Sequence, residues 1–190
     1  MNQADTGRGL DRRDFLKLSA GSLAAFTVLG GALQLSGCSR QNAPAAAGYQ
    51  WLGAEDLPLF SLLIAVSAGP ALPGDAAAQG VIGEGLRRID LACAALGGPA
   101  QQQLRQLLDL LHWAPFRRLA GGVTRSWPEA SAADLTAMLQ RFGDSRLSLL
   151  NAAMRVLAKL GALAFWGQSS GYAAARYPGP PAWAFNALNS

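Results

Sequence analysis

Few side chains in this 190-residue chain could do chemistry: one histidine, two cysteines and twelve acidic residues. His112 is alone, so it cannot build a site with two histidine ligands, and local spacing places no carboxylate pair near it. We expect no hydrolase nucleophile motif of the type Gly-x-Ser-x-Gly, no phosphate-binding loop is present, and no Gly-x-Gly-x-x-Gly follows a strand. We therefore expect no catalytic, cofactor-binding or metal-binding residue, and we expect His112 to cap or pack a helix C-terminus.

The most informative pattern lies near the N-terminus. Five residues there resemble a twin-arginine (Tat) export signal, which carries folded proteins across the inner membrane: Arg12, Arg13, Phe15, Leu16 and Lys17. The uncharged run over residues 18–35 falls short of the roughly 20 apolar residues of a spanning helix and is rich in Gly and Ser. We expect residues 1–37 to be a signal peptide that takes no part in the fold, with an uncleaved signal anchor as the alternative.

The segment Leu35-Ser36-Gly37-Cys38 resembles a lipobox, in which the cysteine is lipidated and becomes the first mature residue. Such a cysteine usually carries three acyl chains, and stable anchoring takes more than one. Ser39 follows instead of an aspartate that would indicate inner-membrane retention. We expect a lipoprotein on the periplasmic face of a membrane, with the outer membrane favoured. Residues 38–48 are then the lipidated cysteine and a flexible tether.

The mature part excludes some other classes of protein. From Cys38 onward it keeps 12 basic and 9 acidic residues, a net charge of +3, and these are scattered, so nothing indicates nucleic-acid binding. Its two basic pairs, Arg87-Arg88 and Arg117-Arg118, are expected on solvated helix faces, with an acidic partner or lipid headgroups as the alternative. Cys93 has no second cysteine to pair with once Cys38 is lipidated, and its apolar surroundings predict a buried, inert thiol.

Apolar residues recur at helical spacing through the mature chain, and no alternating strand pattern persists. We predict an all-α fold, with residues 49–190 forming a single domain of five or six helices. Ser131 and Asp134 have the spacing of a capping box at the start of one helix. The helices are expected over residues 55–67, 81–96, 101–113, 131–142 and 146–166, with a short segment from 115, a loop over 68–78 and an irregular tail over 167–190.

That tail combines proline with aromatic residues. Aromatic side chains bury large areas and dominate the energetics of interfaces, and proline lowers the entropy that a segment loses when it docks. The tail could wrap over the helical core and complete it, or form part of a protein–protein surface, and the two roles are compatible. The aromatic residues at the end of the chain are Phe165, Trp166, Tyr172, Tyr177, Trp183 and Phe185.

Two motifs, together with the leader and the central helices, carry a resemblance that spans most of the chain. They are Ala71-Leu72-Pro73-Gly74-Asp75 and the segment from Tyr172 to Pro181, which contains Tyr177-Pro178-Gly179-Pro180. The chain resembles the gluconate 2-dehydrogenase subunit 3 family, the small subunit of membrane-associated flavin dehydrogenases. It departs from the family where Arg176 replaces the glycine that often precedes Tyr-Pro-Gly-Pro. The tryptophan usually found slightly upstream is Tyr172 here or is missing.

The resemblance implies a non-catalytic escort and anchor subunit. The large subunit of such complexes is a glucose-methanol-choline-type (GMC-type) oxidoreductase that receives FAD in the cytoplasm and has no export signal. The small subunit binds it, and the folded pair leaves through the Tat translocase. Electrons then pass to a cytochrome c subunit or to the respiratory chain. This chain itself is expected to bind no cofactor.

The resemblance also indicates where the partner would bind. The two motif segments are expected to be interface or core-closing elements: Pro73, Gly74, Asp75, Tyr177, Pro178, Gly179, Pro180, Pro181 and Trp183. Two other hypotheses remain open. One is a stand-alone helical envelope lipoprotein with a structural or interaction role, and the other is an enzyme in its own right.

Overall fold

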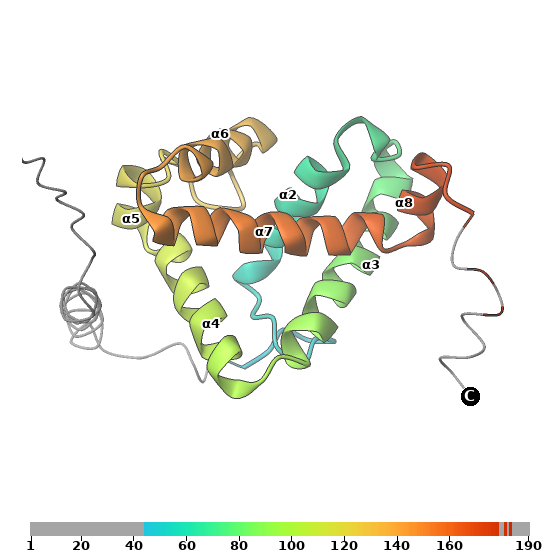
Figure 1. Ribbon diagram of the computed structural model, residues 1–190, viewed down its shortest axis with the longest axis horizontal. Coiled ribbons are helices and arrows are strands. Elements are labelled where there is room, and N and C mark those ends of the chain that lie inside the picture. Colours follow the sequence, from blue (N-terminus) through green and yellow to red (C-terminus); the bar gives the residue numbers. More distant parts are fainter. Residues whose placement is uncertain (1–43, 179–180, 182, 184–190) are drawn as a thin grey trace, which may run out of the picture. The chain divides into compact units, whose positions relative to one another are not determined.

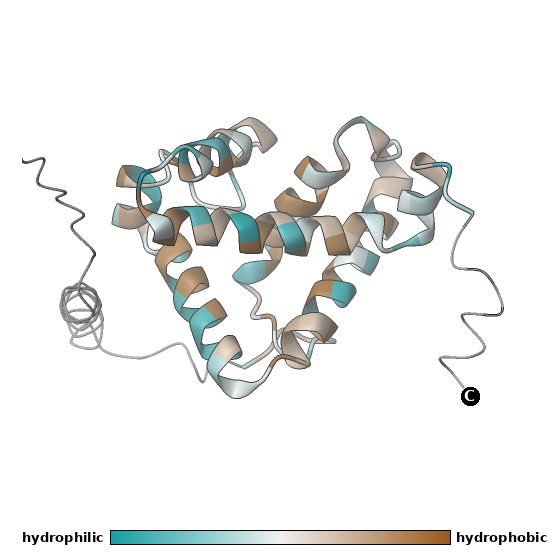
Figure 2. Ribbon diagram, viewed as in Figure 1, coloured by the Kyte–Doolittle hydropathy of each residue, from teal (hydrophilic) through white to brown (hydrophobic). Residues whose placement is uncertain are grey.

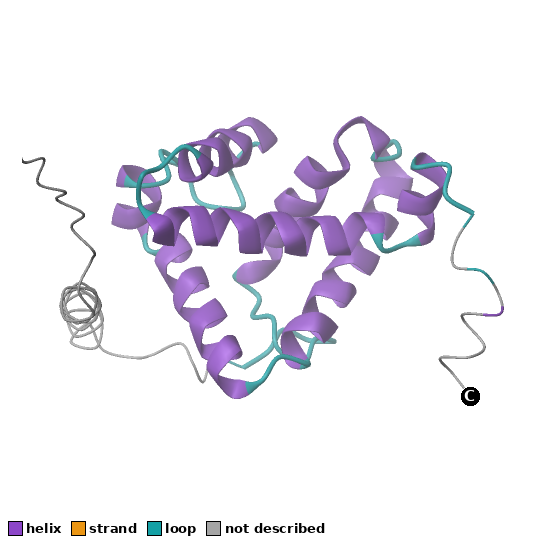
Figure 3. Cartoon of the chain, viewed as in Figure 1, coloured by secondary structure: helices purple, strands orange, loops and turns teal. Residues whose placement is uncertain are grey.

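The computed structural model describes residues 44–178, 181 and 183, and for Asp75 only the backbone. The predicted signal peptide, the lipidation site and most of the tether lie outside these residues, as do Gly179 and Pro180. The all-α prediction is confirmed, because the described part of the chain contains helices and no strand (Figure 3). The helices are α2 (Asp56–Ala68), η2 (Gly69–Ala71), α3 (Asp75–Ala94), α4 (Gly98–His112), α5 (Ala114–Leu119), α6 (Ala132–Gly143), α7 (Ser148–Trp166) and α8 (Ser169–Ala174).

Helix α7 is the central element of the domain. It packs against α2, α3, α6 and α8, and its contact with α2 is the most extensive between any two helices of the described residues. Figure 1 shows α7 running across the domain, with α6 near its N-terminal end and α8 at its C-terminal end. Gly161 permits the close approach of α7 to α2, because a Cβ there would overlap the Ser67 hydroxyl.

Buried side chains from α2, α3, α4, α6 and α7 form one core. Among the largest fully buried are Phe60, Phe142 and Phe165, one from each of α2, α6 and α7. Cys93 is fully buried in the same core, as predicted. Burial and the neighbouring Asp90 carboxylate raise the pKa of the Cys93 thiol to about 12. The thiol therefore stays protonated and unreactive at neutral pH.

The predicted start of α6 is confirmed in detail. The Ser131 hydroxyl accepts a hydrogen bond from the Asp134 backbone N–H at 3.2 Å, and the Asp134 carboxylate accepts one from the Ser131 N–H at 2.8 Å. This is the reciprocal capping box that the spacing of the two residues predicts.

Three other predictions need correction. Helix α3 starts at Asp75 rather than Val81, because the Ala76–Ala78 run favours a helix despite the neighbouring Pro and Gly. The described residues contain seven α-helices instead of five or six, since α8 occupies part of the predicted irregular tail. Arg117 is buried rather than solvated, and its Nη1 donates to the His112 carbonyl oxygen at 3.0 Å.

Candidate functional site

The first described segment of the chain is held by a buried carboxylate. Asp90, in the second half of α3, is only 3% exposed. Its two oxygens accept hydrogen bonds from three successive backbone N–H groups at 2.8–2.9 Å, those of Gln50, Trp51 and Leu52. A buried N–H without an acceptor is costly, so Asp90 fixes this segment against α3. We call residues 49–53 the clasped segment.

A second buried carboxylate holds the end of the clasped segment. Asp56, the first residue of α2, has no exposed surface. Its Oδ2 accepts hydrogen bonds from the Gly53 N–H and from Arg105 Nη1, each at 2.9 Å. Its Oδ1 lies 3.0 Å from His112 Nε2. Arg105 and His112 both come from α4, so this cluster ties α4 to the start of α2.

Arg105 also contacts the clasped segment directly. Its guanidinium stacks on the Trp51 ring, 4.3 Å from the ring centroid, and its Nη2 donates to the Trp51 carbonyl oxygen at 3.3 Å. A cation over an indole face is attracted by the ring quadrupole. The clasped segment is therefore held through its N–H groups, one carbonyl oxygen and one side chain.

The electrostatics of the cluster favour a permanent ion pair. Burial by itself would raise the pKa of the Asp56 carboxyl, but the His112 hydrogen bond, the Arg105 charge and the Gly53 N–H outweigh burial. The pKa of Asp56 is held below its ordinary value of 3.8. Asp56 is thus ionised at neutral pH, and the buried Arg105 charge is compensated.

The polar groups of the cluster are engaged with one another and hold structure. Both Asp56 oxygens are occupied, and His112 Nε2 is committed to one of them. Asp56, Asp90 and His112 line neither the pocket beside Leu104 and Leu160 nor the pocket beside Pro58 and Trp127. Within that part of the chain, no group of three or more His, Cys, Asp or Glu side chains could hold a metal ion.

Of the two roles predicted for His112, capping or packing, the geometry fits packing. His112 is the last residue of α4, but its ring contacts the Asp56 carboxylate, 56 residues away in the sequence, and does not cap its own helix. In the sequence, Asp56, Arg105 and His112 are charged or polar residues between positions where apolar side chains recur, as is usual on a solvated helix face. Nothing local indicated that the three would meet.

The expectation that the chain contains no Gly-x-Ser-x-Gly motif is wrong. Residues 167–171 read Gly-Gln-Ser-Ser-Gly, which matches the Gly-x-Ser-x-Gly spacing of hydrolase nucleophiles. That chemistry requires a serine on a sharp turn between a strand and a helix. Here the segment joins α7 to α8, and Ser169 is exposed at the start of a short helix. The context of a nucleophile is therefore missing.

The same corner is fixed by Gln168 and Gly171. The Gln168 side-chain amide donates to the carbonyl oxygens of Ala164 at 2.7 Å and of Val81 at 3.3 Å. A Cβ on Gly171 would overlap the backbone carbonyl of Phe165. The N-terminus of α8 is therefore close against α7 and joined to α3, in agreement with the view in Figure 1.

The C-terminal motif begins with a Schellman turn. After α8, the Tyr177 N–H donates to the Tyr172 carbonyl oxygen at 2.8 Å, and the Arg176 N–H donates to the Ala173 carbonyl oxygen at 3.1 Å. Arg176 has a φ of 52°, in the left-handed region that favours glycine. The Tyr172 and Tyr177 rings pack edge to face with centroids 5.4 Å apart, which supplies the hydrophobic contact of this turn.

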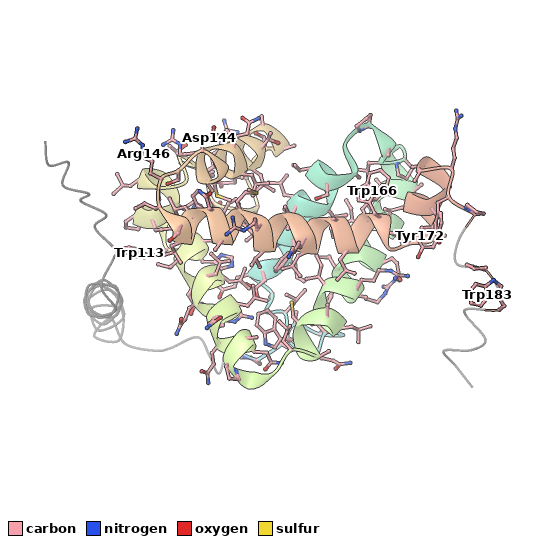
Figure 4. The ribbon with its side chains drawn as sticks, viewed as in Figure 1. Trp113, Asp144, Arg146, Trp166, Tyr172 and Trp183 are labelled. Carbon is pink, nitrogen blue, oxygen red and sulfur yellow. The ribbon has the colours of Figure 1, made fainter. Side chains whose placement is uncertain are left out.

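Most of the predicted interface residues are among those that the structure describes. Pro73 is half-buried, and Gly74 is the exposed N-cap residue of α3. Tyr177 is 48% exposed and Trp183 is 76% exposed, and Figure 4 shows Trp183 outside the helices, beyond Tyr172 and Trp166. Pro178 and Pro181 are exposed as well. Because Gln168 joins α8 to the first half of α3, both segments leave from the same end of the domain.

Comparison with known proteins adds no further constraint. No protein-family model matches the chain, and neither a curated protein nor a solved structure matches it significantly. The function must therefore be inferred from the residues and their geometry.

Proposed function

We propose that this chain is a non-catalytic escort and anchor subunit of an FAD-dependent GMC-type dehydrogenase. It would bind a flavoprotein that has no leader, accompany it through the Tat pathway and hold it at the periplasmic face of a membrane through lipid on Cys38. FAD and the substrate site would belong to the partner.

The observation that carries this proposal is the backbone of Arg176. In the family that the chain resembles, glycine often precedes the Tyr-Pro-Gly-Pro motif, and glycine adopts positive φ without a steric penalty. Arg176 occupies that position with a φ of 52°. The left-handed backbone conformation for which glycine is suited is thus present here, with an arginine at that position. This supports the resemblance at a position where the sequences differ.

The clasped segment supports the anchoring part of the proposal. The tether that would connect Cys38 to the domain ends where Asp90, Asp56 and Arg105 hold residues 50–53. A lipid attached to a loosely held terminus would position the domain poorly. A terminus fixed by buried hydrogen bonds joins the lipid anchor firmly to the folded core, and the length of the flexible tether limits how far the domain can move from the membrane.

The test is export of the flavoprotein in the native host. We expect a leaderless flavin dehydrogenase to co-purify with the tagged chain as a yellow complex, and to stay in the cytoplasm when Arg12-Arg13 becomes Lys-Lys. The matched control changes Arg87-Arg88 to Lys-Lys, which preserves two exposed or half-exposed charges away from the leader. Normal export of the flavoprotein in the Arg12-Arg13 variant would rule out the escort role. A colourless, lone protein would favour the stand-alone lipoprotein.

A further inference from the structure

Helix α7 is more apolar than its packing requires. By length and composition α7 could cross a membrane, but its contacts make it the core helix of this domain. Only 33% of its most apolar 18-residue stretch is buried. Three large apolar side chains remain exposed at seven-residue spacing: Leu149 at 50%, Val156 at 40% and Leu163 at 44%. Residues seven apart share one face of a helix. The apolar residues of α7 therefore form a second stripe outside the core.

This stripe borders a groove between α7 and α4. The groove has a volume of about 360 Å³ and is lined mostly by aliphatic side chains, with Gln103 and Lys159 as its polar lining residues. Figure 2 shows both helices with brown apolar residues beside teal polar ones. We call this the α4–α7 groove, and its principal lining residues are Leu96, Leu104, Leu107, Val156, Lys159 and Leu160.

The charges that α7 brings to this groove are all of one sign. The only charged residues of α7 are Arg155 and Lys159, one turn apart and both exposed. Neither forms an ion pair with any residue that the structure describes. An apolar groove with unpaired cations along one side is complementary to an apolar segment that carries carboxylates.

We propose that the α4–α7 groove binds an amphipathic helix of the partner protein, with apolar side chains in the groove and acidic side chains against Arg155 and Lys159. This inference rests on the proposed function, which supplies the partner. A helix laid in a groove is recognised through anchors spaced three and four residues apart. The Leu149–Val156–Leu163 stripe extends the contact beyond the groove.

Two other occupants fit less well. A second copy of this chain would bring the Arg155 and Lys159 of both molecules together when the apolar stripes met, and like charges in contact are unfavourable. A bilayer surface would contact the exposed stripe but would leave the concave groove unfilled. The shape and the sign of the charge together favour an acidic, helical protein segment.

The test uses the mature protein and two synthetic helical peptides. The two peptides have leucines at identical positions and differ only in their charged residues. One peptide carries glutamates beside the leucines and the other carries lysines. We expect the acidic peptide to bind, and Val156→Asp to weaken binding by about tenfold or more, since a charge would enter an apolar contact. Lys159→Glu should remove most of the preference for the acidic peptide, because the charge of Arg155 is then offset. Leu119→Asp is the matched control, because Leu119 is 82% exposed on α5, away from the groove.

Several results would overturn the proposal: no binding of the acidic peptide, equal binding of both peptides, or an equal loss in Leu119→Asp. Dimers or anionic-vesicle binding that Val156→Asp abolishes, without peptide binding, would assign the surface to a second copy or to lipid instead. The proposed function is tested separately. Wild-type amounts of co-purified flavoprotein with the Val156→Asp/Lys159→Glu double variant would preserve the escort role and refute this surface. Binding of the acidic peptide by a protein that co-purifies with no flavoprotein would support this surface and refute the escort role.

Discussion

Replacing Asp56 by asparagine should destabilise the domain strongly. Asparagine preserves the size of the side chain and one acceptor oxygen, but it removes the charge that compensates Arg105. The Arg105 side chain is 11% exposed and Asp56 is 0% exposed, so the remaining cation would be buried and unpaired. The Gly53 N–H and Arg105 Nη1 already share Oδ2, so they would share a weaker, neutral acceptor, and the oxygen that faces His112 would be replaced by an amide nitrogen.

The expected magnitude follows from the burial of the pair. Removing one partner of a buried ion pair costs about 3–5 kcal/mol, because the other charge is left uncompensated. Asparagine retains part of the hydrogen bonding, so we expect the free energy of unfolding to fall by about 3 kcal/mol. For a domain of this size, that corresponds to a fall of roughly 6–12 °C in Tm.

Urea denaturation of the mature domain measures this loss, with an unchanged m-value as the sign that the folded state keeps its compactness. Asp144→Asn is the control, since this exposed aspartate has no such cluster and should change stability by less than about 0.5 kcal/mol. The double variant Asp56→Asn/Arg105→Met should be less destabilised than the sum of the two single variants, because no unpaired charge remains. A loss below about 1 kcal/mol in Asp56→Asn would refute the buried ion pair.

Three further predictions concern other parts of the domain. Because the pKa of Asp56 is lowered on folding, the stabilisation that its charge provides is complete above about pH 4 and is lost as the pH falls further. The difference in stability between wild type and Asp56→Asn, followed by circular dichroism, should therefore shrink in acid. Ser131→Ala should cost about 0.5–2 kcal/mol in urea unfolding through the lost cap. Arg176→Gly should raise Tm, with a gain of up to about 1 kcal/mol, by relieving the positive φ.

Local patterns predicted most of the helices. The capping box of α6 and the apolar periodicity of α7 depend on residues three, four or seven apart, so the sequence contains them in full. The start of α3 was predicted late because Pro73 and Gly74 were given more weight than the alanines that follow. Helix α8 was missed because its sequence is rich in serine and glycine, and tertiary contacts of Gln168 and Gly171 hold it.

The charge cluster could not be predicted in the same way. Asp56 lies 49 residues from Arg105 and 56 from His112, and Asp90 lies 38–40 residues from the N–H groups that it binds. Each of these residues taken singly is compatible with a solvated helix face. Only the packing of α2, α3 and α4 brings them together, and a single sequence contains no signal for that packing.

Helix α4 connects the two features that the proposals use. Arg105 extends from it to the clasped segment and His112 to Asp56, while Leu104 and Leu107 line the α4–α7 groove. A variant that releases α4 from Asp56 should therefore weaken peptide binding in the groove as well as stability. Variants of exposed groove residues such as Lys159 should weaken peptide binding and leave the free energy of unfolding nearly unchanged. Asp56→Asn therefore tests whether the groove depends on the charge cluster. If the groove is independent of the cluster, Asp56→Asn should lower stability without changing the peptide affinity of the folded fraction.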